Sequence, residues 1–247
     1  MWEPISNFVK AHSIPRSFFL EFRGADLNSV LFAIYGQENR VRRIQAGVWD
    51  NEILCQGCEA RFSDLDHYGW KILGKPDLTQ PVLDQNFDLV GYKTKCDTDK
   101  LRRFILAVLW RASVSLRADF YKGFSLGNHE KEMIKRVFDN TLLSTWEYPT
   151  SVFKLERDFL GPYSKIIFPP MANQLKSGGL MCILYLPGLK ISTMVGDASC
   201  LWMPPQTVIN KPDELFMIFW PKALAQKEIE YIQHLQRRRM EISSRAS

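Results

Sequence analysis

The segment Leu54-Cys55-Gln56-Gly57-Cys58-Glu59 places two cysteines three positions apart, directly before a stretch whose apolar residues have helical spacing. A Cys-x-x-Cys pair forms a tight turn that presents two thiolates on one side, as zinc sites do at the start of a helix. The alternative is a pair of buried, inert thiols. The spacing favours Cys55 and Cys58 as zinc ligands, with His67 and Cys96 as candidates for the remaining positions.

The surrounding sequence predicts two strands before this turn and one helix after it. Residues 16–24 and 39–49 are apolar runs that can form strands, and the segments 24–29 and 36–39 between them have the composition of loops. Apolar residues recur at helical spacing over 59–73. Strand, strand and helix in this order predict a ββα unit.

Together with Ala11-His12-Ser13-Ile14-Pro15, the Leu-Cys-x-x-Cys-Glu segment resembles the HNH superfamily of ββα-metal nucleases over about residues 8–73. The resemblance implies that His12 activates water, a task suited to a side chain that titrates near neutral pH. It implies that Asp50 orients His12 and that Glu59 binds a divalent cation, Mg²⁺ or Mn²⁺. The catalytic candidates are His12, Asp50 and Glu59, and the metal candidates are Cys55, Cys58 and Glu59.

Each catalytic candidate also has a structural alternative. His12 could end a strand, Asp50 could be a turn residue, and Glu59 could be a helix N-terminal carboxylate that the macrodipole stabilises. Ala11 cannot bind a metal, and residues 1–11 contain no cysteine to complete a zinc site. These features favour a second interpretation, a non-catalytic zinc-knuckle module that binds nucleic acid or a partner protein.

The charge of the chain is compatible with a nucleic-acid partner. The formal net charge is +5, and Arg40, Arg42 and Arg43 are clustered near the expected second strand. Such a cluster can neutralise backbone phosphates, and the HNH resemblance implies DNA as the substrate. Further basic clusters occur at 100–117 and 237–239, and the alternative for any of them is a solvated helix face.

The remainder of the chain predicts a helical scaffold followed by a sheet. A linker rich in Pro and Asp spans 74–88, and Thr98-Asp99 can cap a helix over 100–117 that is apolar around most of its circumference and therefore buried. A second helix is expected from Asn128 to just before Tyr148. An antiparallel sheet of four or five strands and a terminal helix over 222–240 follow, and the expected strands are 151–155, 164–168, 179–186, 189–195 and 215–220.

These elements predict an α+β fold with two domains, an HNH-like ββα module over 1–95 and a helix-plus-sheet domain over 96–247. The organisation, including Leu106 to Ser115, resembles a family of bacterial proteins with Ser/Ala-His-x-x-Pro and Leu-Cys-x-x-Cys-Glu segments. The resemblance implies a metal-dependent endonuclease that cuts DNA as the effector of a bacterial anti-phage or toxin system. Residues 96–247 would then bind a partner protein.

Composition and cysteine content indicate the cellular compartment of the protein. Of 247 residues, 46% are hydrophobic and 24% are charged, which is typical of a globular protein that folds without disulfides. The five cysteines are an odd number and widely spaced, and no signal peptide is recognisable. No apolar run approaches the ~20 residues of a membrane span. We therefore expect a cytoplasmic protein with no membrane partner.

Overall fold

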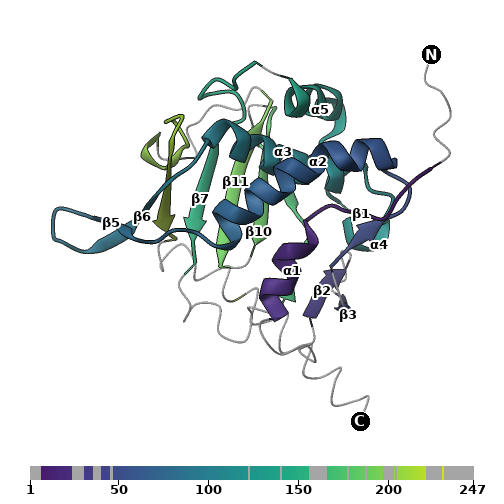
Figure 1. Ribbon diagram of the computed structural model, residues 1–247, viewed down its shortest axis with the longest axis horizontal. Coiled ribbons are helices and arrows are strands. Elements are labelled where there is room, and N and C mark those ends of the chain that lie inside the picture. The colour runs from purple at the N-terminus through teal and green to yellow at the C-terminus, as the bar shows by residue number, and fades with distance from the viewer. Residues whose placement is uncertain are drawn as a thin grey trace, which may run out of the picture.

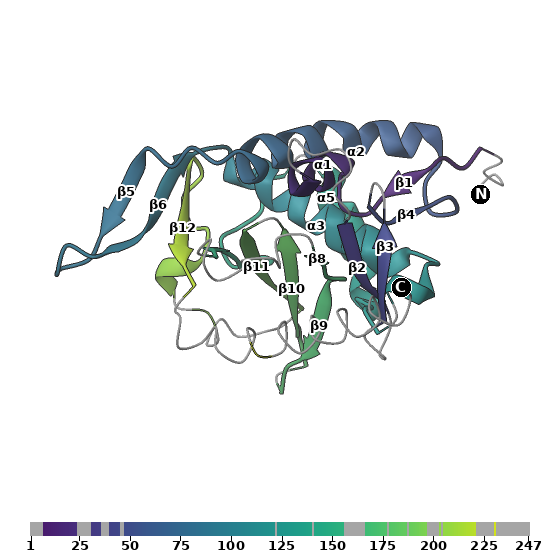
Figure 2. The same cartoon turned by 90° about the horizontal axis from the view of Figure 1, so that it is seen from below.

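The computed structural model has the mixed α+β architecture that the sequence predicts, with helices stacked on one face of a seven-stranded sheet (Figure 1). Seen from below, helix α3 (Thr98–Val114) lies between the sheet and helix α2 (Gln56–Gly69), which gives three layers (Figure 2). The residues that the structure describes are 7–23, 31–35, 40–44, 47–121, 123–139, 141–155, 166–176, 178–186, 188–196, 203, 205–220 and 230.

Helix α3 is the central element of the fold. Asp97 caps its N-terminus, because the Asp97 carboxylate accepts a hydrogen bond of 2.9 Å from the Lys100 N–H. Leu101, Phe104 and Leu106 are fully buried, since α2 covers one side of α3 and the sheet covers the other. The prediction of a buried helix over about 100–117 is therefore confirmed.

The main sheet is larger than predicted and is not purely antiparallel. Its order is β5-β6-β12-β7-β11-β10-β9, and the β12–β7 pair is parallel. The predicted strands at 151–155, 179–186, 189–195 and 215–220 are confirmed, whereas an antiparallel sheet of four or five strands was wrong. The strands are β5 (Gln80–Leu83), β6 (Leu89–Lys95), β7 (Thr150–Lys154), β9 (Met171–Gln174), β10 (Leu180–Leu186), β11 (Leu189–Val195) and β12 (Glu214–Phe219).

The predicted linker over 74–88 contains strand β5 and the turn that joins it to β6. The two strands form a hairpin that extends away from the body of the molecule (Figure 1, Figure 2). Asp84 Oδ1 accepts hydrogen bonds from the N–H groups of Asn86 (2.8 Å) and Asp88 (2.9 Å), which fixes the turn. Phe87 at its tip has φ of 64° and is 82% exposed.

The segment 16–24, expected to be a strand, instead contains helix α1 (Arg16–Arg23). Phe18 and Phe19 are both buried and Leu20 is exposed, whereas a strand would direct Phe18 and Leu20 to the same face. Pro15 precedes the helix, in keeping with the preference of proline for helix N-termini. The apolar residues therefore follow a helical face rather than a strand.

Two small sheets lie beside α1. Strand β1 (Ala11–His12) pairs antiparallel with β4 (Trp49–Asp50). Strand β2 (Leu31–Tyr35) pairs antiparallel with β3 (Arg40–Ile44) and parallel with β8 (Ile166–Ile167), so the strand expected at 164–168 lies outside the main sheet. The strand that precedes α2 is thus β4. The loops expected at 24–29 and 36–39 lie outside the described residues.

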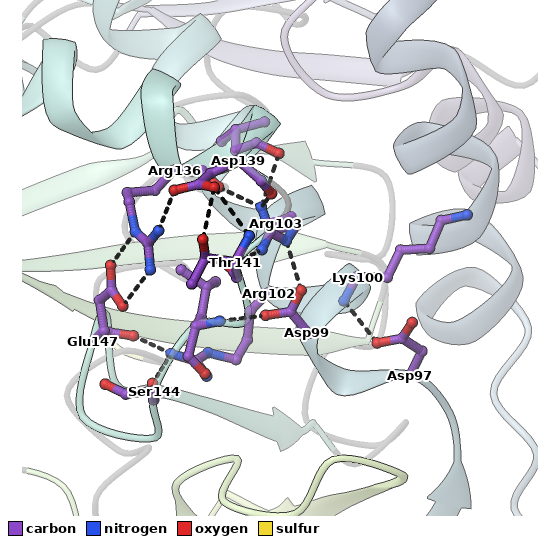
Figure 3. A network of polar contacts seen from close by, with 12 residues as sticks. Asp97, Asp99, Lys100, Arg102, Arg103, Arg136, Asp139, Thr141, Ser144 and Glu147 are labelled. Atoms are coloured by element: carbon purple, nitrogen blue, oxygen red, sulfur yellow. Dashed lines mark hydrogen bonds and ion pairs between the residues drawn. The ribbon is translucent and has the colours of Figure 1, made fainter.

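Helix α5 (Glu130–Phe138) follows a 3-10 turn, η2 (Gly127–His129), so the predicted start near Asn128 is confirmed. The helix ends well before Tyr148, because the backbone carbonyls after its last turn bind buried arginines of α3 (Figure 3). The other short helical turns are η1 (Trp70–Gly74), α4 (Ala118–Tyr121) and η5 (Pro205–Thr207). The predicted terminal helix over 222–240 lies outside the described residues, apart from Glu230.

One hydrophobic core includes residues from both predicted domains. The Phe18 ring of α1 stacks on the Phe104 ring of α3 with 5.9 Å between ring centroids, and Met217 of β12 belongs to the same buried cluster. Strand β6, which precedes the predicted boundary at residue 95, pairs with β12 near the other end of the chain. None of the described helices combines the length and apolar character needed to cross a membrane.

Candidate functional site

The two short strands β1 and β4 position His12 and Asp50. His12 is opposite Trp49 in the pairing, and Asp50 is opposite Ala11. Directly opposed side chains of a pair share one face of the sheet, so His12 and Asp50 lie on opposite faces. His12 is half-buried, and the protein encloses its Nε2 atom.

The strand of His12 runs alongside the segment that leads into α2. The Val9 N–H donates a hydrogen bond of 2.9 Å to the Leu54 carbonyl, and Phe8 forms an isolated bridge with Cys55. β1, β4 and α2 therefore have the strand, strand, helix order of a ββα unit, with α1, β2 and β3 between the two strands. The ββα unit predicted from strands at 16–24 and 39–49 is not formed by those segments, because 16–24 contains helix α1, and an HNH-type module stays a prediction.

Asp50 anchors β4 to the end of α3. It is 5% exposed, and its carboxylate accepts three hydrogen bonds of 2.8 Å, from the Glu52 N–H, the Ser115 hydroxyl and the Leu116 N–H. The hydrogen bond from the Glu52 N–H is the local contact expected if Asp50 is a turn residue. A role of Asp50 in orienting His12 stays a prediction.

Cys55 and Cys58 occupy the first turn of α2. Cys55 is the N-cap, and its Sγ accepts a hydrogen bond of 3.4 Å from the Cys58 N–H. This bond and the Cys58 thiol lower the pKa of Cys55, whereas the hydrogen bond to Cys55 and burial raise the pKa of Cys58. Both cysteines are free and half-buried. The predicted helix after the knuckle is confirmed, starting at Gln56.

Glu59 lies one turn into α2 in an unusual environment for a carboxylate. Burial raises its pKa, the neighbouring Arg111 guanidinium opposes this increase, and the Asp66 carboxylate adds to it. The Oε2 atom of Glu59 is buried and accepts no hydrogen bond. A carboxyl group of this kind can bind a cation or exchange a proton near its raised pKa.

Arg111 is a charged neighbour of Glu59 that the sequence analysis did not identify. It is fully buried in α3 and donates two hydrogen bonds to the Asp66 carboxylate, at 2.8 and 2.6 Å. Its guanidinium carbon also lies 5.0 Å from the centroid of the Phe62 ring. The available signal was an arginine directly after the apolar run 104–110, but its pairing with Asp66 depends on tertiary packing.

The metal-ligand candidates do not form a complete group. Among the described residues, no three His, Cys, Asp or Glu side chains gather in a way that could bind a metal ion. Cys96 packs against the core, where burial raises its pKa to about 12, and His67 is exposed on α2. Metal binding by Cys55, Cys58 and Glu59 therefore stays a prediction.

Of the predicted phosphate-binding arginines, Arg40, Arg42 and Arg43 lie on β3. They pair with residues 35, 33 and 32 of β2. The structure describes the backbone of β3, and the orientation of these three side chains is outside the described part. Nucleic-acid binding by β3 stays a prediction, and the cluster at 237–239 lies outside the described residues.

The arginines of α3 were expected either to bind phosphates or to lie on a solvated helix face, and the structure shows neither. Arg102, Arg103 and Arg111 are 4%, 7% and 0% exposed, so they are neither phosphate-binding groups nor parts of a solvated face. Arg102 donates to the Ser144 carbonyl at 2.7 Å, and Arg103 donates to the Thr141 carbonyl at 2.6 Å (Figure 3). They anchor the segment after α5 to the core.

Comparisons of the chain with protein-family models, with curated proteins and with solved structures gave no match. The functional interpretation therefore depends on the residues and contacts described above.

Proposed function

We propose that the β1, β4 and α2 unit is the active site of a metal-dependent, HNH-type endonuclease that cuts DNA. The observation that carries the proposal has two parts. Phe8 and Val9, just before the strand of His12, contact Cys55 and Leu54 at the start of α2, and Glu59 in the first turn of α2 has a buried carboxylate oxygen that accepts no hydrogen bond. A carboxyl group whose pKa is shifted by burial and by specific charged neighbours is a functional candidate.

In this proposal His12 accepts a proton from the water that attacks the phosphodiester. Glu59 provides a hard oxygen ligand for Mg²⁺ or Mn²⁺, and a bound cation would stabilise charge on the scissile phosphate. Mg²⁺ typically keeps several waters and uses one or two carboxylates together with substrate phosphate oxygens. A single carboxylate therefore fits such an ion, even though no group of three ligands occurs among the described side chains.

Arg40, Arg42 and Arg43 supply positive charge for the DNA backbone in this proposal. Replacing all three by Gln should weaken DNA binding and make its dependence on salt shallower, because fewer counterions are released on binding. The role of effector in an anti-phage or toxin system, with a partner protein bound to residues 96–247, extends the same proposal. Exposed Leu142 and Trp146 are apolar residues in that part of the chain.

The decisive experiment compares His12→Ala with His67→Ala in cleavage of duplex and single-stranded DNA and RNA with Mg²⁺ or Mn²⁺. His67 is an exposed histidine of α2, and its loss should leave cleavage unchanged. Loss of a general base lowers turnover about 10²- to 10⁴-fold, so His12→Ala should be nearly inactive while retaining its fold and DNA affinity. Undiminished cleavage by a folded His12→Ala protein would refute the proposal.

A second candidate function is a non-catalytic module that binds nucleic acid or a partner protein. It is favoured by the engagement of Asp50 in three hydrogen bonds that join β4 to neighbouring backbone and to α3. If wild-type protein binds DNA but does not cleave it with any divalent metal, this function replaces the first.

A further inference from the structure

The first turn of α2 brings two reactive sulfur atoms together. The Cys55 backbone is extended, with φ of −81° and ψ of 166°, and its Sγ points back to accept the Cys58 N–H at 3.4 Å. The Cys58 thiol is also hydrogen-bonded to Cys55. Because Cys55 Sγ contacts the backbone nitrogen of Cys58, the two cysteine side chains lie in the same turn.

The other described thiols, Cys96 and Cys182, are less available for reaction than this pair. Cys55, Cys58 and Cys96 are half-buried, and Cys182 is 1% exposed within β10. Burial raises the pKa of Cys96 to about 12, which keeps its thiol protonated at neutral pH. No third His, Cys, Asp or Glu side chain joins the pair to form a metal-binding group in the described part of the chain. The surroundings therefore provide an isolated pair of thiols.

We infer that Cys55 and Cys58 form a reversible disulfide with each other by exchange with small-molecule disulfides. Cys55 is the N-cap residue at the start of α2, whereas Cys58 packs against the core, so Cys55 is the attacking sulfur that a small-molecule disulfide reaches first. Cys58, which already contacts that sulfur, is the resolving thiol.

The exchange takes place in two steps and is balanced. Cys55 Sγ attacks one sulfur of oxidised glutathione, the glutathione S–S bond breaks, and one glutathione leaves and takes up a proton. Cys58 then loses its proton and attacks Cys55 Sγ, which forms the intramolecular disulfide and releases the second glutathione. The two cysteines lose two electrons, and oxidised glutathione gains them. The disulfide would close the first turn of α2 and remove both sulfurs as zinc ligands.

The experiment uses the full chain, treated with a chelator and a reductant and then desalted. The protein is equilibrated with mixtures of reduced and oxidised glutathione, alkylated and analysed by peptide mass spectrometry. Cys55 and Cys58 lie in one tryptic peptide, residues 44–61, because no Lys or Arg separates them. We expect that peptide to lose both alkylation sites together and to become lighter by two hydrogen atoms, and we expect dithiothreitol to reverse the change.

Two variants test the assigned roles. Cys58→Ser should accumulate a glutathione adduct on Cys55, because no resolving thiol remains, and this adduct should form at least ~10-fold faster than any adduct on Cys182. Cys96→Ser is the matched control and should oxidise like wild type. The inference is overturned if wild-type peptide 44–61 keeps both thiols under oxidised glutathione, or if either cysteine pairs with Cys96, Cys182 or Cys200.

Discussion

The Glu59 carboxyl group is half-buried, and one of its oxygens accepts no hydrogen bond, so its ionisation costs free energy that Arg111 offsets only in part. A carboxyl group whose pKa is raised on folding contributes stability at low pH, and this contribution is lost as pH rises through the folded pKa. The protein is therefore less stable at neutral pH because of Glu59. This local instability is consistent with a residue retained for ligand binding.

We expect Glu59→Gln to raise the melting temperature at pH 7 and to have little effect at pH 4, below the ordinary glutamate pKa of 4.5. The gain should stay below about 1 kcal/mol, because the exposed part of the carboxyl group is screened by water. Calorimetry at both pH values measures it, with Glu52→Gln as the control, since Glu52 is exposed. An equal effect at both pH values would contradict the role of ionisation.

At the scale of elements, α3 is connected to the segment after α5 by buried guanidinium groups. Arg103 donates to the carbonyls of Arg136, Asp139 and Thr141 and forms an ion pair of 2.6 Å with Asp99 (Figure 3). The Arg136 carbonyl belongs to the last turn of α5 and the other two follow its end, so one side chain satisfies several backbone acceptors that the helix leaves unpaired. The segment 139–147 therefore depends on α3 for its conformation.

Replacing Arg103 by Met should lower the free energy of unfolding by ~2–4 kcal/mol, because several buried carbonyls lose a donor and the Asp99 carboxylate keeps only the hydrogen bond from the Leu143 N–H among the contacts described for it. Lys135→Met, at an exposed position of α5, is the matched control and should change stability by less than ~0.5 kcal/mol. Urea denaturation measures both. Hydrogen exchange should also accelerate first in 139–147, and unchanged exchange there would show that Arg103 does not order this segment.

At the scale of the whole molecule, the shared core predicts a single cooperative unfolding transition. Gly91 of β6 tests this, because an added Cβ would lie 2.3 Å from the Met217 carbonyl oxygen of β12. Gly91→Ala should destabilise the protein by ~1–3 kcal/mol and lower the midpoints measured for α2 and for the sheet together. Gly57→Ala is the control, since its Cβ would meet open space. Separate midpoints would instead support independent domains.

The sequence predicted the elements whose pattern is local and missed those that depend on distant partners. The apolar circumference of α3 and the Cys-x-x-Cys start of α2 are visible in the chain. In α1, Phe18, Phe19 and Leu20 are equally compatible with a strand until burial distinguishes them. Pro81 indicates a linker, although an edge strand accepts proline. The pairing of Arg111 with Asp66, and its effect on the pKa of Glu59, could not be predicted, because both require α2 and α3 to pack together.

The β5–β6 hairpin affects how the protein behaves in concentrated solution. β5 is an edge strand of the described sheet, and exposed Leu83, Phe87 and Leu89 lie on the same ribbon. Free edges with apolar side chains are templates for intermolecular strand pairing, which leads to precipitation. Pro81 removes one backbone donor from β5, and Asp84 and Asp88 add charge at the tip. This hairpin therefore combines an exposed apolar strand edge with features that oppose aggregation. Substitutions at Pro81 would lower the solubility of the protein before they lowered its stability.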